Sequence, residues 1–413
     1  MTASSTVLAP AAIERIRGAA EQHSSSMVAL AQRLIQTQSA PGEEAQISEL
    51  VLAEMRRTGY DDAWRDDAGN IIGVLRGDGD GPRVQFNTHL DHVSAGDPSL
   101  WARPPFGGII EDGVLYGRGA SDIKAAMAAQ VALVPVLRSA GLKPRGDVYV
   151  VAVVLEEVGG LGSRYLAETL PTDIAVIGEA TNNELRRGHR GRVFVDVSFT
   201  GLSTHASAPE RGRNPHYAAA RFLLKIENLA MKPHPTFGGS TMAPTWYETD
   251  QTSGNVTPGT VSVFLDWRNV PGESESDVLA RIETIAKDVE REVEGITAVV
   301  SVVGRPVETY TGLRDTMPST LPFETAAGNP ALTTARAVLE VAFKREIRVG
   351  TWTFATDGGH LHQHGVTTLG FGPSEERFAH TIHDQVSVEQ LHEALFGNAV
   401  LAVALSAIPT EQQ

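Results

Sequence analysis

The chain has 413 residues, no cysteine and a formal net charge of -15 at pH 7. This length is enough for two domains, and the lack of cysteine excludes disulfides and thiolate metal sites. The negative charge argues against nucleic-acid binding, which needs a basic face. The N-terminus shows no basic segment followed by an apolar one, and no run of about 18 apolar residues occurs. A soluble, cytoplasmic protein with no membrane contact is therefore expected.

The first predicted elements alternate between helices and strands. In chain order they are helices within 26–60, a strand at 84–88 and an alanine-rich helix at 125–137. The strand leads directly to His89 and Asp91, and an acid two residues after a histidine is well placed to orient its imidazole. Asp122 lies on a glycine-bearing loop that opens the alanine-rich helix. Alone, it could be a helix N-cap, a position that aspartate fills well.

Two adjacent glutamates are the most informative pair in the chain. Glu156 and Glu157 follow the apolar run 148–155, which predicts a buried strand. Like charges side by side at the exit of such a strand repel each other, so folding alone gives little reason for them. One acid bound to a metal and the other free to accept a proton would explain the pair. A surface turn is the alternative.

From Arg190 the pattern changes, which predicts a second domain inserted into the first. The expected order there is βαββαβ, the ferredoxin-like arrangement. Its elements are strands at 193–199, 241–248, 260–267 and 297–303 and helices at 215–229 and 277–293. The predicted organisation is an α/β catalytic domain made of 1–183 and 306–413, interrupted by an α+β lid at 184–305.

Two further strands deliver candidate ligands. The strand at 173–178 ends at Glu179, and the strand at 367–371 leads through a Gly-Pro loop to His380. Ligands in open α/β sheets gather at the carboxyl ends of strands, so Glu179 should converge with His89, Glu156 and Glu157, which also follow strands directly. A solvated strand end and a loop histidine are the less specific alternatives. Carboxylate and imidazole ligands without thiolate suit zinc, and also cobalt or manganese.

The ordered motifs closely resemble the co-catalytic metallopeptidase family of aminoacylases, acetylornithine deacetylases, succinyl-diaminopimelate desuccinylases and bacterial glutamate carboxypeptidases. The resemblance spans roughly residues 84–390. Its motifs are Thr88-His-Leu-Asp91, Gly117-Arg-Gly-Ala-Ser-Asp122-Ile-Lys124, Glu156-Glu157, Gly178-Glu-Ala-Thr181, Gly201-Leu-Ser-Thr-His205-Ala-Ser and Ala379-His-Thr381. The order is highly specific, although no single motif is. It implies a mixed-sheet zinc-peptidase domain with an inserted ferredoxin-like lid.

The resemblance also implies a role for each residue. The implied ligands of two divalent ions, with zinc favoured, are His89 and Glu179 for one ion, Glu157 and His380 for the other, and Asp122 bridging both. Glu156 would be the general base, taking a proton from water and passing it to the leaving nitrogen, with Asp91 behind His89. His205 would stabilise the charge on the carbonyl oxygen. In dimeric relatives the equivalent histidine comes from the other subunit, so a homodimer through the lid is implied. A loop residue is the alternative for His205.

Three residues are expected to bind substrate. The resemblance implies that Asn255 and Arg268 hold its free carboxylate, which the planar fork of arginine binds bidentately. Gly372 lies in a loop that would offer backbone N–H groups at the same end. A surface salt bridge and an ordinary turn are the alternatives. Asp384 replaces a glutamate usual in relatives, and this shorter acid is expected to alter the support of His380.

These inferences predict a metal-dependent amidohydrolase that cleaves the amide bond of an N-acyl amino acid or a similar small N-substituted amino acid. A dipeptidase or carboxypeptidase and an N-carbamoyl amino acid hydrolase remain alternatives, because each needs the same metal chemistry. A non-catalytic binding protein that kept the fold is a different class. The intact acids argue against it, since drift would be expected first at the base.

Overall fold

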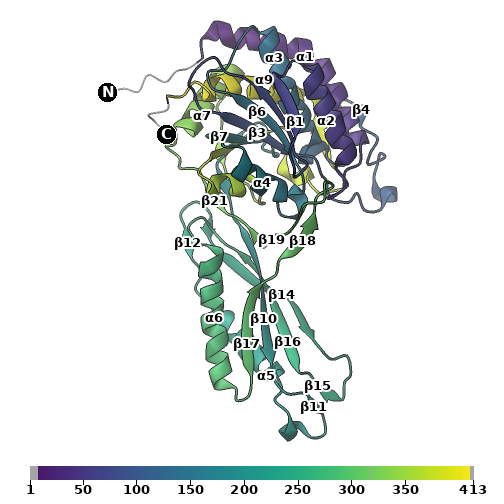
Figure 1. Ribbon diagram of the computed structural model, residues 1–413, viewed down its shortest axis with the longest axis vertical. Coiled ribbons are helices and arrows are strands. Elements are labelled where there is room, and N and C mark those ends of the chain that lie inside the picture. The colour runs from purple at the N-terminus through teal and green to yellow at the C-terminus, as the bar shows by residue number, and fades with distance from the viewer. Residues whose placement is uncertain (1–7, 318, 410–413) are drawn as a thin grey trace. The chain divides into compact units, whose positions relative to one another are not determined.

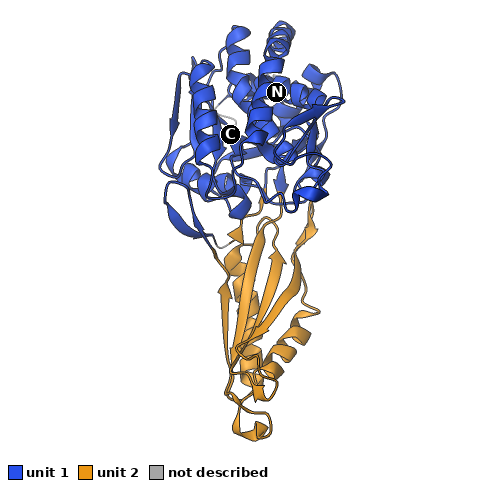
Figure 2. Ribbon diagram, turned by 90° about the vertical axis from the view of Figure 1, so that its right-hand side faces the viewer, with its two compact units in different colours: residues 1–188, 306–317, 324–413 blue, residues 189–305, 318–323 orange. Residues whose placement is uncertain are grey.

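The computed structural model describes residues 8–317 and 319–409 (Figure 1). They form two compact units (Figure 2). Unit 1 comprises residues 1–188, 306–317 and 324–413, and unit 2 comprises 189–305 and 318–323. The first division thus falls after residue 188, beyond the expected boundary at 183. The reason is strand β8 (Leu185–Arg186), which pairs with β22 (Val349–Gly350) inside unit 1. The return of 318–323 to unit 2 was not expected.

Unit 1 is built on a mixed sheet, in which the described residues form eight strands with the order β1-β2-β6-β3-β7-β23-β8-β22. The remaining bounds are β1 Asp62–Arg65, β2 Ile71–Leu75, β3 Val84–His89, β6 Val148–Val153, β7 Ile174–Ile177 and β23 Thr367–Gly370. The central strands β6, β3, β7 and β23 are parallel. Their carboxyl ends therefore meet at one edge of the sheet, as the four predicted strands require.

Helices cover both faces of this sheet (Figure 1). The larger core joins inward side chains of β3 and β6 to α1 (Pro10–Gln36), α2 (Ala45–Arg57), α3 (Ala125–Ser139), α7 (Pro330–Phe343) and α9 (Val388–Leu405). A smaller core on the opposite side chains of β2 and β6 includes Leu166 of α4 (Leu161–Thr169), which contacts α8 (Gly358–Gln363). Helix α1 begins at Pro10, well before the helices predicted from residue 26.

Helix α3 is the central core helix of unit 1. The segment Ala120–Ser139 is long and apolar enough to cross a membrane, but 94% of its most apolar 18-residue window is buried inside the fold. Pro135 lies within α3 and has no N–H to offer the carbonyl of Val131 one turn earlier. The hydroxyl of Tyr60 donates to that carbonyl at 2.9 Å. A side chain from outside the helix thus replaces the missing backbone donor.

Short strands in unit 1 pair segments that are far apart in the chain. The other bounds in this unit and at its junctions are β4 Ile109–Glu111, β5 Val114–Tyr116, β9 Gly188–His189, β18 Arg305–Glu308, β19 Arg314–Met317, β21 Phe323–Glu324 and β24 Gln385–Ser387. Strand β24 pairs with β5 in register Gln385↔Tyr116. This pairing brings the segment after His380 alongside the loop that carries Asp122.

Unit 2 has the predicted βαββαβ order and the strand order β14-β16-β10-β17, in antiparallel pairs. Its bounds are β10 Arg192–Thr200, α5 His216–Ile226, β14 Thr241–Thr249, β16 Thr260–Arg268, α6 Glu275–Glu292 and β17 Thr297–Val302. Alternate residues of β10 and β16 pack against α5 and α6. Ser274 and Asp277 form a capping box that begins α6. The ferredoxin-like arrangement of the insertion is confirmed.

Small strands complete unit 2. They are β11 Thr204–His205, β12 Pro233–His234, β13 Gly238–Gly239, β15 Val256–Thr257 and β20 Ser319–Thr320. Strands β11 and β15 pair with each other beyond the end of the sheet at which β16 begins (Figure 1). This placement separates two of the expected substrate residues, as described below.

Candidate metal centre

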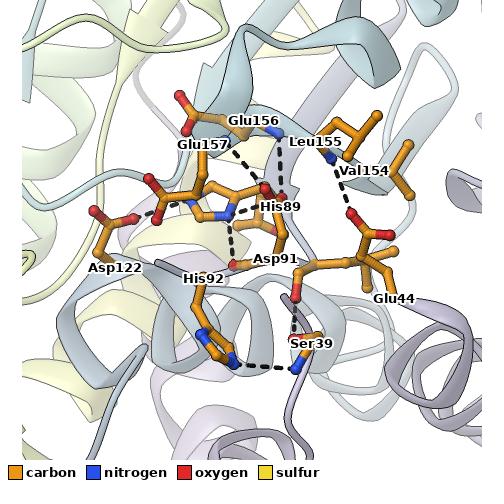
Figure 3. A network of polar contacts seen from close by, with 12 residues as sticks. Ser39, Glu44, His89, Asp91, His92, Asp122, Val154, Leu155, Glu156 and Glu157 are labelled. Atoms are coloured by element: carbon orange, nitrogen blue, oxygen red, sulfur yellow. Dashed lines mark hydrogen bonds and ion pairs between the residues drawn. The ribbon is translucent and has the colours of Figure 1, made fainter. Parts of the chain in front are cut away.

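The carboxyl edge of the parallel strands collects acids and a histidine. His89 is the last residue of β3, and Glu179 follows β7 after one glycine. Glu156 and Glu157 lie in a 3-10 turn after β6. Asp122 lies in the turn 120–124 before α3, and its peptide bond to the next residue is cis. Figure 3 shows the His89, Asp122 and Glu157 side chains pointing toward one another.

Asp122 lies between two imidazoles and offers one carboxylate oxygen to each. Its Oδ1 is 2.9 Å from Nε2 of His89, and its Oδ2 is 3.0 Å from Nε2 of His380. Glu157 approaches the same His380 nitrogen at 3.0 Å, and Glu179 approaches the His89 nitrogen at 3.5 Å. The structure thus brings all five expected ligands together, in two groups that share Asp122.

Glu156 lies at the same centre. The ligand atoms of His89, Glu156 and Glu179 lie within 4.8 Å of one another, as do those of His89, Asp122 and Glu157. Distance alone therefore permits Glu156 to be a ligand as well. Among the described residues, however, its carboxylate is the one acid of the centre that forms no ion pair with either imidazole.

The electrostatics of the centre show an excess of buried negative charge. Burial raises the pKa of Glu179 to about 8 and raises that of Glu156 well above its usual range. Hydrogen bonds to Asp122 and Glu157 raise the pKa of His380 to about 10. Burial also favours the neutral form of Asp122, but hydrogen bonds from the two imidazoles hold its pKa well below the ordinary value. Contact with the imidazoles therefore favours the charged form of Asp122, while burial favours the neutral form of the neighbouring glutamates.

This donor set fits divalent cations. Oε2 of Glu179 is buried and has no hydrogen-bond partner among the described residues, and an unpaired buried carboxylate oxygen is costly. Carboxylate oxygens and imidazole nitrogens are ligands that zinc takes in proteins. A cation between the acids would satisfy the unpaired oxygen and offset the buried charge.

Comparison with known proteins decides the family. Residues 85–396 match Peptidase family M20/M25/M40. The chain belongs to this family. It is 27% identical to the uncharacterized protein YgeY of Escherichia coli K12 over 402 residues, covering 95% of this chain and 97% of YgeY. It is 31% identical to succinyl-diaminopimelate desuccinylase 2 of Ruegeria sp. over 262 residues, covering 60% of this chain and 66% of that one.

The fold agrees with this membership. The crystal structure of aminopeptidase PepT from Bacillus cereus matches with a TM-score of 0.74 at 20% identity, covering 93% of this chain and 99% of that one. As a member of the M20/M25/M40 family, the chain is a metal-dependent hydrolase that cleaves amide bonds of acyl amino acids or peptides. The predicted family, fold class and enzyme class are confirmed.

Asp91 lies behind His89 in this M20/M25/M40 member, as expected, and has a second set of contacts. Nδ1 of His89 lies 3.0 Å from the backbone carbonyl of Asp91 and 3.5 Å from its carboxylate. The two carboxylate oxygens also accept the backbone N–H groups of Glu156 and Glu157, at 3.2 and 3.1 Å. The acid therefore holds the turn that carries both glutamates, in addition to lying behind the histidine (Figure 3).

Asp384 also has partners that the sequence did not indicate. Its carboxylate accepts the N–H groups of Gly119 and Ser121, at 2.8 and 2.7 Å, and a hydrogen bond from Arg118 at 2.9 Å. These contacts support the loop that precedes Asp122, and none of them is to His380. The acid was visible in the sequence, but its partners depend on the pairing of β24 with β5.

The buried acid Asp357, the N-cap residue of α8, has contacts that the sequence did not predict. Asp357 accepts a hydrogen bond from the Ser163 hydroxyl at 2.7 Å. Burial is the main cause of the raised pKa of Glu156, and the negative charge of Asp357 is the second cause. His360 on the same helix is buried, with Nε2 at 2.9 Å from the carbonyl of Gly159. Only the acid-and-glycine character of residues 354–360 could have signalled this segment.

The lid residues divide into two places within unit 2. His205 on β11 and Asn255 next to β15 lie together, because the N–H of Ala206 donates to the Asn255 carbonyl. Arg268 ends β16, a strand that spans about 26 Å at the usual rise per residue. Asn255 and Arg268 therefore lie toward opposite ends of the sheet of unit 2, and their shared contact with one substrate carboxylate stays a prediction. Arg268 pairs with Asp266 at 2.6 Å, the salt bridge named as its alternative.

Gly372 does not offer a free N–H group. Its amide donates to the hydroxyl of Thr181 at 3.1 Å. A Cβ at this position would lie 2.2 Å from the carbonyl oxygen of Gly178 and 2.6 Å from that of Glu179. The glycine permits close backbone packing under the strand end that carries Glu179, and the expected substrate contact through its amide is wrong.

Proposed function

We propose that this M20/M25/M40 member is a deacylase that hydrolyses the amide bond of an N-acyl amino acid. The observation that carries the proposal is Asp122, which faces one imidazole with each carboxylate oxygen. The sequence relatives that include a succinyl-diaminopimelate desuccinylase support an acyl amino acid. A dipeptidase or carboxypeptidase and an N-carbamoyl amino acid hydrolase are the competing activities on the same centre.

We infer two metal sites from the two groups of ligands. His89 and Glu179 would hold one ion, Glu157 and His380 the other, and Asp122 would bridge them. Oxygen and nitrogen donors favour zinc, with cobalt or manganese as alternatives. When bound, such ions lower the pKa of a water and polarise the substrate carbonyl.

Glu156 is our proposed general base. It lies within 4.8 Å of the ligand atoms of His89 and Glu179, yet it pairs with neither imidazole among the described contacts. An acid in this position can take a proton from the attacking water and pass it to the leaving nitrogen. Asp91 supports this step because its carboxylate holds the backbone of the Glu156 turn.

His205 is our proposed donor to the carbonyl oxygen of the substrate. Its Nδ1 accepts the backbone N–H of Ser207 at 3.2 Å, so the ring proton belongs on Nε2. The side chain is exposed, and an outward N–H is what a developing oxyanion needs. We propose that it acts in the other subunit of a homodimer, as the family resemblance implies.

An exposed edge of unit 2 supports such a dimer. Strand β14 is the edge strand of the sheet, with Trp246 63% exposed and Tyr247 44% exposed. Tyr217 and Leu224 on α5 are 66% and 70% exposed. An open edge strand beside exposed apolar side chains is a surface that another strand and helix can cover. In a dimer, Asn255 and Arg268 could reach one carboxylate from different subunits.

The proposal is tested by metal analysis followed by hydrolysis assays on acetyl-, succinyl- and carbamoyl-amino acids and on dipeptides. We expect about two metal ions per chain and the highest kcat/KM on one of the N-acyl amino acids. Highest activity on dipeptides or carbamoyl compounds would replace the deacylase assignment. Protein that stays metal-free and inactive with zinc, cobalt or manganese would overturn the metal centre.

The expected cytoplasmic location stays a prediction, which fractionation of the producing cells tests.

A further inference from the structure

The turn that carries Glu156 begins with a residue in an unusual backbone conformation. Leu155 has φ 60° and ψ 31°, the left-handed region that a side chain other than glycine rarely adopts. Its own side chain is buried in the core of unit 1. The backbone conformation of Leu155 sets the direction in which the next two residues leave the strand. A contact that fixes the Leu155 backbone therefore also fixes the orientation of the Glu156 side chain.

Three successive backbone N–H groups in this turn point at two buried carboxylates. The N–H groups of Glu156 and Glu157 donate to Asp91, and that of Leu155 donates to Oε1 of Glu44 at 3.3 Å. Consecutive N–H groups at a left-handed turn form a concave site for anions. Figure 3 shows Glu44 approaching the turn at Leu155, away from the Asp91 contacts.

Glu44 is itself built into the fold at this point. It is the residue before α2, is fully buried, and its Oε1 also accepts the N–H of Gly42 at 3.0 Å. Its other oxygen, Oε2, is buried and has no hydrogen-bond partner among the described residues. A buried acid with one unpaired oxygen is costly for folding, so stability alone does not account for a glutamate here.

We propose that Glu44 is a positioning residue for the hydrolysis: it holds the Leu155 amide and thereby fixes the orientation of the Glu156 carboxylate. Asp91 holds the two following amides, and both acids together keep the turn in the conformation described above. The inference rests on the proposed role of Glu156 as general base. Glu44, the residue before α2, would thus affect the reaction without contacting the proposed metal ligands or the substrate.

The test compares Glu44→Leu, which removes both acceptor oxygens at similar volume, with Glu44→Gln, which keeps one. We expect Glu44→Leu to lower kcat about 10- to 100-fold, because small misplacements of a reacting group have effects of this size. KM and metal content should stay within about twofold, and Glu44→Gln should recover most of the lost kcat. Glu43→Leu, at the adjacent exposed acid, is the matched control and should behave as the unmodified protein.

A second readout does not depend on activity. Hydrogen exchange of a peptide spanning residues 150–160 should be faster in Glu44→Leu, at the amide of Leu155, and unchanged in Glu44→Gln. Wild-type kcat and exchange in Glu44→Leu would overturn the inference, as would equal losses in the leucine and glutamine variants. If Glu44→Leu does not fold, Glu44→Asp, whose shorter side chain draws the oxygen back from Leu155, takes its place.

Kinetics of Glu156→Gln show separately whether the proposed role of Glu156 as general base is wrong. If Glu156→Gln keeps its turnover, the general base is wrong, whatever Glu44 does. If Glu156→Gln is inactive while Glu44→Leu has normal kcat and normal exchange, the base stands and the positioning role is wrong.

Discussion

Asp384 binds the guanidinium of Arg118 at 2.9 Å, and neither side chain is more than 4% exposed. The same carboxylate accepts the amides of Gly119 and Ser121. One acid near the C-terminal helix therefore holds the loop that leads to Asp122, and it joins two segments that are 266 positions apart in the chain.

Removing the charge of this acid should destabilise unit 1. Asp384→Asn would leave the buried Arg118 without its counter-charge, and breaking a buried pair on one side costs about 3–5 kcal/mol. Urea unfolding followed by far-UV circular dichroism measures the loss. Asp80 pairs with Arg145 at 2.6 Å, but its side chain is 86% exposed. Asp80→Asn is the matched control, and equal losses in both variants would contradict the prediction.

The adjacent glutamates should fail in different ways. Glu156→Gln should lower kcat about 10²- to 10⁴-fold, the range typical of lost general acid–base catalysis, with metal content unchanged. Glu157→Gln should reduce metal content, because Glu157 faces His380 at 3.0 Å in the second group of ligands. Metal analysis and steady-state kinetics on both variants separate the two roles. A loss of metal in Glu156→Gln would make that residue a ligand.

Tyr60 and Pro135 should be coupled through the carbonyl of Val131. Tyr60→Phe removes the hydroxyl that donates to this carbonyl and should cost about 1–3 kcal/mol, the usual price of a buried acceptor left unpaired. In a Pro135→Ala background the helix regains its own N–H donor, so the same substitution should cost less. A double-mutant cycle of unfolding free energies measures the coupling. Additive effects would mean that the hydroxyl does not replace the missing donor.

The stability of the metal-free protein should depend on pH through Glu44. Burial, with the charge of Asp91 adding, raises the pKa of Glu44 from 4.5 to about 7. Between about pH 4.5 and 7, therefore, Glu44 keeps its proton in the folded state but has lost it in the unfolded state. The stability linked to this proton is fully present below about 4.5 and is lost as the pH rises to about 7, by up to about 3 kcal/mol.

Glu44→Gln cannot titrate, so its unfolding free energy should fall less than that of the unmodified protein between about pH 4.5 and 7. Urea unfolding at several pH values, with a chelator present, gives the two curves. Parallel curves would show that this acid does not carry the pH dependence.

Mixing two inactive variants tests whether His205 serves the other subunit. His205→Ala lacks the proposed oxyanion donor, and Glu156→Gln lacks the proposed base. If the histidine acts across a dimer, half of the subunits in a mixed dimer have a complete site, and an equal mixture should recover about a quarter of the normal activity. No recovery after subunit exchange, verified by light scattering of tagged dimers, would place His205 in its own subunit's site.

Long periodic segments made most of unit 1 and unit 2 predictable. The apolar runs before His89, Glu156 and Glu179 mark strand ends, and parallel strands end at a common edge. The candidate ligands could therefore be placed together without coordinates. Helix α1 was only partly predicted, because residues 10–25 combine alanines with exposed polar residues and show a weaker apolar period.

Contacts between distant short segments could not be read from the sequence. The partners of Asp384 depend on β24 and β5, which are three residues each and too short for a pattern. The amide of Gly372 is satisfied by Thr181, a pairing that no local signal shows. Glu44 has no periodicity or motif that links it to Leu155. Each of these contacts is set by tertiary packing and not by local sequence.

Most of unit 2 is inserted into the chain between residues 188 and 306 of unit 1, and this order has a consequence for synthesis. Strand β23 pairs with β7 in register Thr367↔Ile174, so the inserted domain leaves the ribosome before the central sheet can be completed. Until then, β7 presents an open edge, and Glu157 lacks the imidazole of His380. Binding of a metal by all five proposed ligands would therefore come late in the synthesis of each chain, after unit 2 has had time to fold.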